Sequence, residues 1–373
     1  MRTMLCDLLG IEYPIVGFTP SEQVAAAISR AGGLGVLGCV RFNDPADLDQ
    51  ALTWMDSHTD GRPYGIDVVM PARVPTEGSA ADLDQLIPPG HKEFVEQTLL
   101  KLGVPPLSAG EATPAGVLGW LHSVARQHVE VALAHPARLI ANALGSPPED
   151  VIARAHAAGM LVAALAGKAS HAHAQVANGV DIVVAQGYEA GGHTGEIASM
   201  VLVPEIVDAV SSPLAGTAVP VLAAGGIGSG RQIAAALALG AVGVWMGSAW
   251  LITQEYTTST SAPALTEALR QATSSDTVRS RIYSGKPARL LKNRWTQAWG
   301  EPGAPDPLPM PLQNVLVADA HQRLIRSGDP DVVPMPVGQI VGRMNEVRPV
   351  AEVIAALVRE TDETLARMGN LAS

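Results

Sequence analysis

The sequence predicts a closed α/β barrel of eight parallel strands, a (β/α)8 TIM barrel, with an inserted cap segment and a helical C-terminal extension. Eight short apolar runs bounded by turn residues recur along the chain, and helix-compatible segments lie between most of them. The runs are apolar on both faces, as expected for strands covered by helices outside and by one another inside. A doubly wound open sheet is the alternative architecture.

Strands and helices are expected in alternation. The expected strands are Pro14–Gly17, Leu34–Gly38, Tyr64–Val69, Arg138–Ala143, Met160–Ala164, Asp181–Ala185, Val219–Ala224 and Val242–Met246. The expected helices are Ser21–Ala31, Pro45–Ser57, Pro148–Ala158, Ser170–Asn178, Pro204–Val210 and Gly230–Leu239. Ser21 is a suitable N-cap and Pro148 suits a first helical turn.

Two segments exceed what a minimal barrel needs. The interval from Met70 to His135 is too long for a simple loop, and its helical stretches, Lys92–Leu102 and Pro114–Gln127, indicate a cap or lid. A tail follows the last strand and ends in the amphipathic helix Pro349–Met368. We therefore expect a barrel over 1–69 and 136–255, an inserted cap over 70–135, and an extension over 256–373 that completes the barrel and the substrate region.

Composition excludes several classes of protein. Hydrophobic residues make up 47% of the chain and charged residues 16%, which is typical of a globular protein and not of a disordered one. The formal charge of −11 without a Lys/Arg block argues against nucleic acid as a partner. The two cysteines, Cys6 and Cys39, fit neither a disulfide scaffold nor a zinc site. His171 and His173 would face different sides of a helix, so no metal site is expected.

No membrane segment or secretion signal is expected. Asp7 and Glu12 interrupt the N-terminal apolar residues, so a cytoplasmic location is predicted. The uncharged stretch 232–254 has the length of a membrane span. However, Gly240, Gly243 and Gly247 divide it into a short helix and a buried strand, which is typical of an α/β protein.

One glycine pattern imitates a dinucleotide fingerprint. Gly33, Gly35 and Gly38 satisfy G-x-G-x-x-G. That fingerprint must follow a strand and open a helix, whereas here the glycines follow a helix and lie in a strand. Close packing of the helix on the strand explains them better.

A glycine-rich loop after the sixth strand carries the most informative side chains. It runs from Gln186 to Gly195, and His193 is its single imidazole. Glycines let backbone N–H groups approach a ligand, and active sites of barrels lie at this end of the strands. His193 is therefore the candidate base or hydrogen-bond donor. Gln186 offers an amide suited to the edge of a heterocycle.

Two further loops have the composition of a phosphate site. Residues 223–230 follow the seventh strand and include Gly225 and Gly226, and residues 245–248 follow the eighth. In barrels these two loops, with a helix N-terminus, commonly bind phosphate through backbone donors. Both together indicate a phosphorylated cofactor at the barrel mouth.

These runs, with Gly285–Arg289 and Gly338–Arg348, closely resemble the nitronate monooxygenases and their sister group, the flavin-dependent enoyl-acyl-carrier-protein reductases. The resemblance implies FMN, with its phosphate against Gly225, Gly226, Gly247 and Ser248, beside Met246. It places the isoalloxazine near Gln186, Gly191 and Gly192, with His193 beside it as the catalytic residue. Two positions depart from the family pattern: Phe18 lies where the family usually follows Ala-Pro with Met, and Asp67 replaces a frequent Asn.

The resemblance implies an FMN-dependent oxidoreductase that oxidises alkyl nitronates with O2 to a carbonyl compound and nitrite. The first alternative is an enoyl-thioester reductase in which NAD(P)H reduces the flavin. An alternative of another class is a barrel that binds flavin or a metabolite without catalysis. Lys168, after the fifth strand, could reach the flavin or an anionic substrate, or be an ordinary exposed loop residue.

Overall fold

The computed structural model of the chain describes residues 1–70, 80–107, 119, 121–212, 217–260 and 262–371. Parallel strands close into a barrel in the order β1-β11-β10-β6-β5-β4-β3-β2. Their bounds are β1 Ile15–Thr19, β2 Leu34–Gly38, β3 Tyr64–Val68, β4 Leu139–Asn142, β5 Leu161–Ala166, β6 Ile182–Gln186, β10 Val221–Ala224 and β11 Gly243–Met246. Closure confirms the (β/α)8 barrel and contradicts the open sheet. Each expected strand is present, with ends that differ by at most two residues.

The barrel interior is packed with side chains. Alternate strand residues, such as Val16, Val36 and Leu222, share one buried interior cluster, whereas their neighbours face the surrounding helices. Helix α1 (Met4–Leu9), which the sequence analysis did not predict, adds Leu5 and Leu9 to the interior cluster. It lies at the end of the barrel where the strands begin, opposite the loops that carry the predicted site residues.

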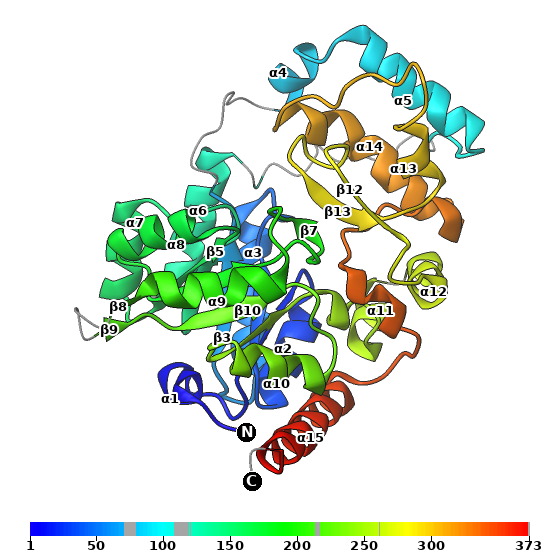
Figure 1. Cartoon of the computed structure of the whole chain (residues 1–373). Helices are drawn as coiled ribbons and strands as arrows, with labels where there is room; N and C mark the ends of the chain where they lie inside the picture. The colour runs from blue at the N-terminus through cyan, green and yellow to red at the C-terminus, as the bar shows by residue number, and fades with distance from the viewer. Residues whose placement is uncertain (71–79, 108–118, 120, 213–216, 261, 372–373) are drawn as a thin grey trace.

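Helices surround the barrel as the alternating pattern predicts (Figure 1). They are α2 Glu22–Arg30, α3 Pro45–His58, α6 His122–Leu133, α7 Glu149–Ala157, α8 Ala169–Ala177, α9 Ser199–Val210 and α10 Gly230–Ala238. Ser21 caps α2 by accepting the Val24 amide. A Cβ on Gly35 would collide with the Ala25 backbone of α2, which confirms that this glycine pattern serves packing. The expected helix Pro114–Gln127 lies partly outside the described residues.

Helix α9 starts earlier than predicted. The predicted start at Pro204 rested on the preference of proline for a first turn, yet Pro204 lies inside the helix, which begins at Ser199. The Glu189 carboxylate accepts the Ser199 amide hydrogen, with O···N distances of 3.0 and 3.2 Å, and caps the helix there. A cap from a different loop gives no local sequence signal, which explains the wrong boundary.

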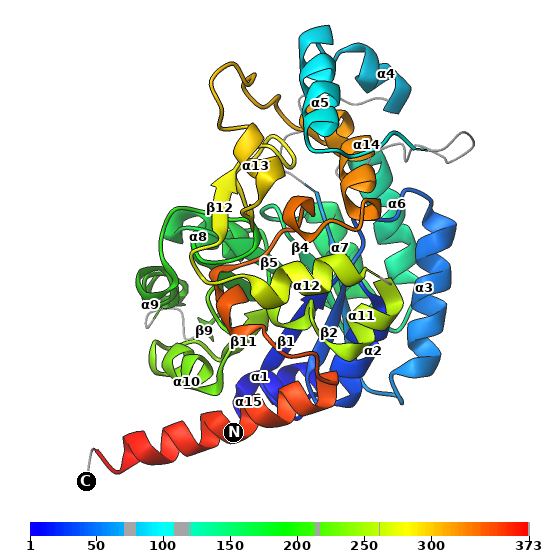
Figure 2. The ribbon, with the colours of Figure 1, turned by 90° about the vertical axis from the view of Figure 1, so that its right-hand side faces the viewer.

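A second lobe lies beyond β12 (Thr277–Ser280) and β13 (Ala288–Leu291), as Figures 1 and 2 show. It combines α4 (Ala80–Gln85) and α5 (Pro89–Lys101) with α13 (Arg294–Ala298) and α14 (Leu312–Arg326). Leu99, Trp295 and Val317 are buried in one core there. Arg323 forms an ion pair with Glu96, 227 residues away, at 2.9 Å. Helices α4 and α5 thus share a core with α13 and α14, whereas α6 packs on the barrel. The proposed division into domains stays a prediction.

The rest of the tail returns to the barrel. After η1 (Ser248–Trp250) it forms α11 (Gln254–Thr260), α12 (Pro263–Gln271), η2 (Pro330–Val332), η3 (Gln339–Arg343) and α15 (Val350–Gly369). The last confirms the predicted amphipathic helix, which packs against α10 and α2 (Figure 2). The stretch 232–254 contains α10, β11 and η1, as expected. No described helix is both long enough and apolar enough to cross a bilayer.

Candidate functional site

Three glycine-rich loops meet at the open end of the barrel. They follow β6, β10 and β11, which are adjacent in the barrel. The Gly187 amide donates to the Ala224 carbonyl at 2.9 Å, and the Ser199 hydroxyl donates to the Gly225 carbonyl at 2.9 Å. The Gly338 amide, from the tail, donates to Ser248 Oγ at 2.8 Å. The tail therefore completes the junction between the loops.

Backbone conformation and close contacts require glycine at several of these positions. Gly225 and Gly226 have φ angles of 93° and 71°, a left-handed conformation that side chains disfavour. A Cβ on Gly191 would lie 2.6 Å from the Gly338 nitrogen. Gly247 differs, since a Cβ there would meet only a Phe18 ring atom, at 3.8 Å. The β11 loop therefore has space beside its backbone where a ligand could approach.

A short antiparallel sheet fixes His193. Strand β7 (Gly192–His193) pairs with β13, which pairs with β12, and His193 lies opposite Ala288. The His193 Nε2 atom lies 2.6 Å from the hydroxyl of Ser284, which is fully buried. Burial, and then the positive charge of Lys286, lower the pKa of His193 to about 4. The imidazole is therefore neutral at physiological pH.

Arg289 holds the His193 loop against the hairpin. Its guanidinium is buried and donates to the Tyr188 carbonyl at 2.9 and 3.1 Å. It also donates to Thr277 Oγ1 at 3.0 Å and lies 4.4 Å from the centre of the Tyr188 ring. Two bonds from a planar fork to one carbonyl restrict the loop more than a single contact would. Arg289 and Glu189 thus set the position of the loop that carries His193.

The other predicted site residues differ in which of their groups could face a ligand. Gln186 ends β6 and shares the inward face of Ile182 and Val184. Met246 has its side chain in the outer hydrophobic cluster, so only its backbone could face a cofactor. Ser248 accepts the Gly338 amide, which leaves its own hydroxyl hydrogen to donate to a ligand.

Asp67 is the unusual group inside the barrel. It is 2% exposed, on β3, and follows the inward alternation of Gly65. Its Oδ1 has no hydrogen-bond partner among the described residues, and desolvation raises its pKa well above the ordinary range. Phe18 and Trp245 stack at 6.4 Å between ring centres in the same interior. Two stacked aromatic rings and a carboxyl oxygen without a hydrogen-bond partner among the described residues thus lie inside the barrel.

The N-terminus of α10 is already occupied. The Gly230 amide donates to Glu360 of α15 at 2.7 Å, and the Gly228 amide donates to Gln232 at 2.9 Å. Gly225 and Gly226, the part of the β10 loop nearest the strand, lie beside the β11 loop and could bind a phosphate together with it. The helix end itself, which the sequence pattern suggested as a contributor, is bonded to a carboxylate.

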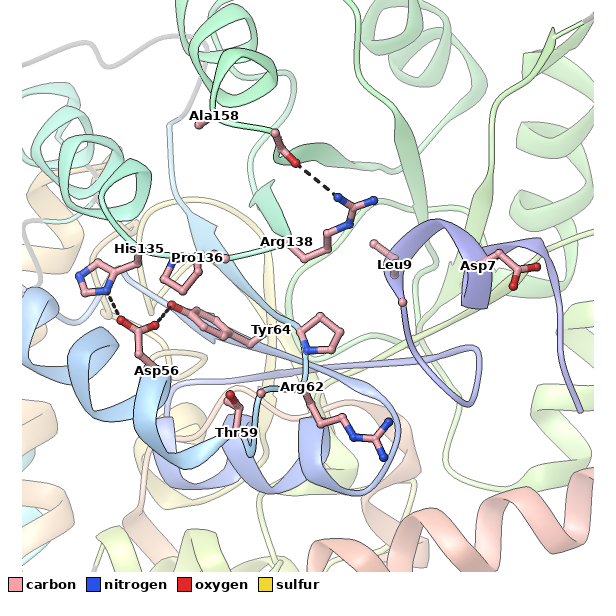
Figure 3. Close-up of a pocket in the computed structure, with 15 residues that line it drawn as sticks. Asp7, Leu9, Asp56, Thr59, Arg62, Tyr64, His135, Pro136, Arg138 and Ala158 are labelled. Atoms are coloured by element: carbon pink, nitrogen blue, oxygen red, sulfur yellow. Dashed lines mark hydrogen bonds and ion pairs between the residues drawn. The ribbon is translucent and has the colours of Figure 1, made fainter.

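A separate hollow of about 620 Å³ lies at the other end of the barrel (Figure 3). It is lined by turns that precede β3, β4 and β5, including Arg62, His135 and Gly159. Arg138 also lines it and donates to the Leu8 carbonyl at 2.8 Å and to the Gly159 carbonyl at 3.4 Å. His135 and its neighbours thus lie at the end of the barrel opposite His193.

Several site residues were not found by reasoning from sequence. Ser284 and Lys286 lie in or beside the Gly285–Arg289 run, whose resemblance was noted without a role for its side chains. Glu189 lies inside the predicted loop, but its partner Ser199 is revealed only by folding. Lys168 precedes α8 and has no part in the contacts among His193, Ser284 and Lys286 described above.

The chain resembles known proteins along almost its whole length. The sequence model of the nitronate monooxygenase family matches residues 2–360. The chain is 48% identical over 384 residues to a Mycobacterium tuberculosis protein named "putative monooxygenase". The alignment covers 100% of this chain and 99% of that protein. The chain belongs to the nitronate monooxygenase family.

Solved structures extend the comparison. Nitroalkane oxidase from Streptomyces ansochromogenes is 29% identical, with a TM-score of 0.79, over 98% of this chain and 99% of that one. FabK from Thermotoga maritima is 27% identical, with a TM-score of 0.72, over 100% and 99% of the two chains. As a member of the nitronate monooxygenase family, the chain is a flavin-dependent oxidoreductase.

Proposed function

We propose that the protein is an FMN-dependent enzyme that oxidises alkyl nitronates with O2 to a carbonyl compound and nitrite. The observation that carries this proposal is the neutral imidazole of His193, fixed at the meeting point of three glycine-rich loops. Membership in the nitronate monooxygenase family supports the same substrate class.

The residues at the barrel mouth fit a flavin phosphate. Gly225, Gly226, Gly247 and Ser248 would hold the phosphate, through backbone amides and the Ser248 hydroxyl. The isoalloxazine would be bound near Gln186, Gly191 and Gly192. The unpartnered Oδ1 of Asp67 indicates that a hydrogen-bonding group from outside the chain belongs in this interior. When bound, FMN would supply the electron-transfer chemistry that side chains lack.

His193 would act on the substrate mainly by hydrogen bonding. With a pKa of about 4 it is a weak base at neutral pH, so it is poorly suited to taking a proton from a neutral nitroalkane. A nitronate has already lost that proton. The site chemistry therefore favours the nitronate over the nitroalkane, with His193 orienting the nitro group.

The second candidate is an NAD(P)H-dependent enoyl-thioester reductase, which the resemblance to flavin-dependent enoyl reductases raises. It would use the same loops for FMN, and His193 would help deliver a proton to the alkene. A ring whose pKa is about 4 carries little proton at neutral pH, which disfavours this role for His193.

Anaerobic mixing of the purified holoprotein distinguishes the two candidates. Bleaching of the flavin by propyl-2-nitronate, with little bleaching by NADH or NADPH, is the expected result. Bleaching by a nicotinamide cofactor alone would favour the reductase. A flavin spectrum that none of these reductants changes would contradict both candidates and favour a barrel that binds flavin without catalysis.

A further inference from the structure

The turn between β12 and β13 brings a cation to the catalytic imidazole. Ser284 Oγ lies 2.6 Å from His193 Nε2, and the Lys286 amide donates to the same oxygen at 3.4 Å. Because Ala288 pairs with His193 across the β7–β13 ladder, this turn is fixed next to the imidazole. His193, Ser284 and Lys286 therefore form one hydrogen-bonded unit.

Lys286 has no anionic partner within the described ranges of the chain. Its side chain is partly buried, and no carboxylate of the described residues forms an ion pair with its ammonium group. Burial lowers the pKa of Lys286, and no acidic neighbour offsets that effect. A partly desolvated ammonium without a counter-charge is unfavourable, so a bound anion would stabilise it.

Arg279, Arg281 and Arg289, the arginines of this hairpin, each donate a hydrogen bond to a backbone carbonyl. Arg279 pairs with Glu196 at 3.5 Å and donates to the Thr194 carbonyl at 3.2 Å. Arg289 is buried beneath Tyr188 and bonded to its carbonyl. His193 is neutral and cannot supply a positive charge. Lys286 is thus the cation of this unit that is available to a ligand.

We propose that Lys286, beside the Ser284-held imidazole of His193, binds the negatively charged oxygens of the substrate, and that this site selects small planar oxyanions such as nitronate and nitrite. The proposal rests on the proposed function in naming the nitronate. The anion site itself depends only on Lys286, Ser284 and His193. It gives the protein a means to prefer an anionic nitronate over the neutral nitroalkane.

Isothermal titration calorimetry of the holoprotein with sodium nitrite, at constant ionic strength, tests the site directly. Lys286→Met should weaken nitrite binding by about 10- to 100-fold, the value of one charge-assisted hydrogen bond. Lys286→Arg keeps the charge and should stay within a few-fold of wild type. Lys292→Met, which removes an exposed lysine six residues away, is the matched control and should bind nitrite as wild type does.

Unchanged nitrite binding in Lys286→Met, or an equal loss in Lys292→Met, would overturn the proposal. If Lys286→Met does not fold, kinetics of the wild-type enzyme still test whether nitrite and nitronate bind at the same site. Nitrite should compete with propyl-2-nitronate in steady-state kinetics, and non-competitive inhibition would contradict a shared site. If nitrite binds through Lys286 but nitronate does not bleach the flavin, the proposed substrate is wrong and the anion site stands.

Discussion

At the scale of single residues, we expect the protonation states of His193 and Asp67 to govern the chemistry that we propose for the barrel mouth. His193 could be predicted from sequence because one imidazole stands among glycines that need no polar side chain. Its neutrality could not, because the shift depends on burial and on Lys286 in a distant hairpin. Both groups give tests in which pH is the variable.

His193 should stay unprotonated well below pH 6.5, the ordinary pKa of a histidine. Because the pKa of His193 in the folded protein is about 4, kcat/KM for propyl-2-nitronate should show no inflection from His193 between pH 5.5 and pH 8. His193→Ala should retain FMN and lose about 10²- to 10⁴-fold in kcat/KM. Rapid mixing of preformed nitronate provides the measurement. An inflection near pH 6.5 that disappears in His193→Ala would contradict this assignment.

The buried carboxyl group of Asp67 should lower the stability of the folded protein as pH rises. Its pKa is raised on folding, so the folded state holds the proton more tightly than the unfolded state. Stability is therefore lost as pH rises above the unfolded pKa, near 3.9. Asp67→Asn should raise the melting temperature by roughly 2–6 °C at pH 8 and by less at pH 4. Thermal melts at equal flavin loading measure this, and a destabilised variant at pH 8 would contradict it.

At the scale of elements, the sequence predicts the barrel strands well and the site-forming sheet poorly. The strands are short apolar runs between turn residues, so their signal is local. Strand β7 has only two residues, Gly192 and His193, and exists because β13 pairs with it. Similarly, α9 begins where Glu189 caps it. Contacts between distant segments produce these elements, which is why periodicity does not reveal them.

Arg289→Met tests whether the hairpin holds the His193 loop. Losing both bonds to the Tyr188 carbonyl should loosen the loop and weaken FMN binding by about 10-fold or more. FMN release is measured by fluorescence after ultrafiltration. Arg289→Lys should recover only part of the affinity, because an ammonium lacks the planar fork. Arg270→Met, on an exposed ion pair, is the control, and equal FMN loss in both variants would argue against the clamp.

At the scale of the whole molecule, the C-terminal tail forms part of the loop junction where we propose that the flavin binds. Gly338 joins the β6 and β11 loops, and α14 shares a core with α5. The sequence indicates an insertion and an extension from their lengths. It does not show that they pack together, because Arg323 and Glu96 lie 227 residues apart.

Gly338→Ala, in the C-terminal tail, should disturb the proposed flavin site at the barrel mouth. The Cβ added at this position would lie 2.8 Å from the Glu189 carbonyl oxygen and 3.0 Å from the Gly191 nitrogen. The tail and the β6 loop must therefore move apart. Overpacking of this kind should lower the melting temperature by roughly 2–6 °C and weaken FMN binding. Gly90→Ala, in α5 with no atom within 4 Å of its Cβ, is the matched control. Equal FMN affinity in the two variants would show that the tail does not shape the site.

The most direct measurement is the visible spectrum of the purified protein, followed by identification of the cofactor released on heating. We predict an oxidised-flavin band, FMN in the supernatant at about one per chain, and bleaching by propyl-2-nitronate without oxygen. A colourless protein that does not take up added FMN, or one that releases a different cofactor, would contradict the account of three loops closing on one flavin phosphate.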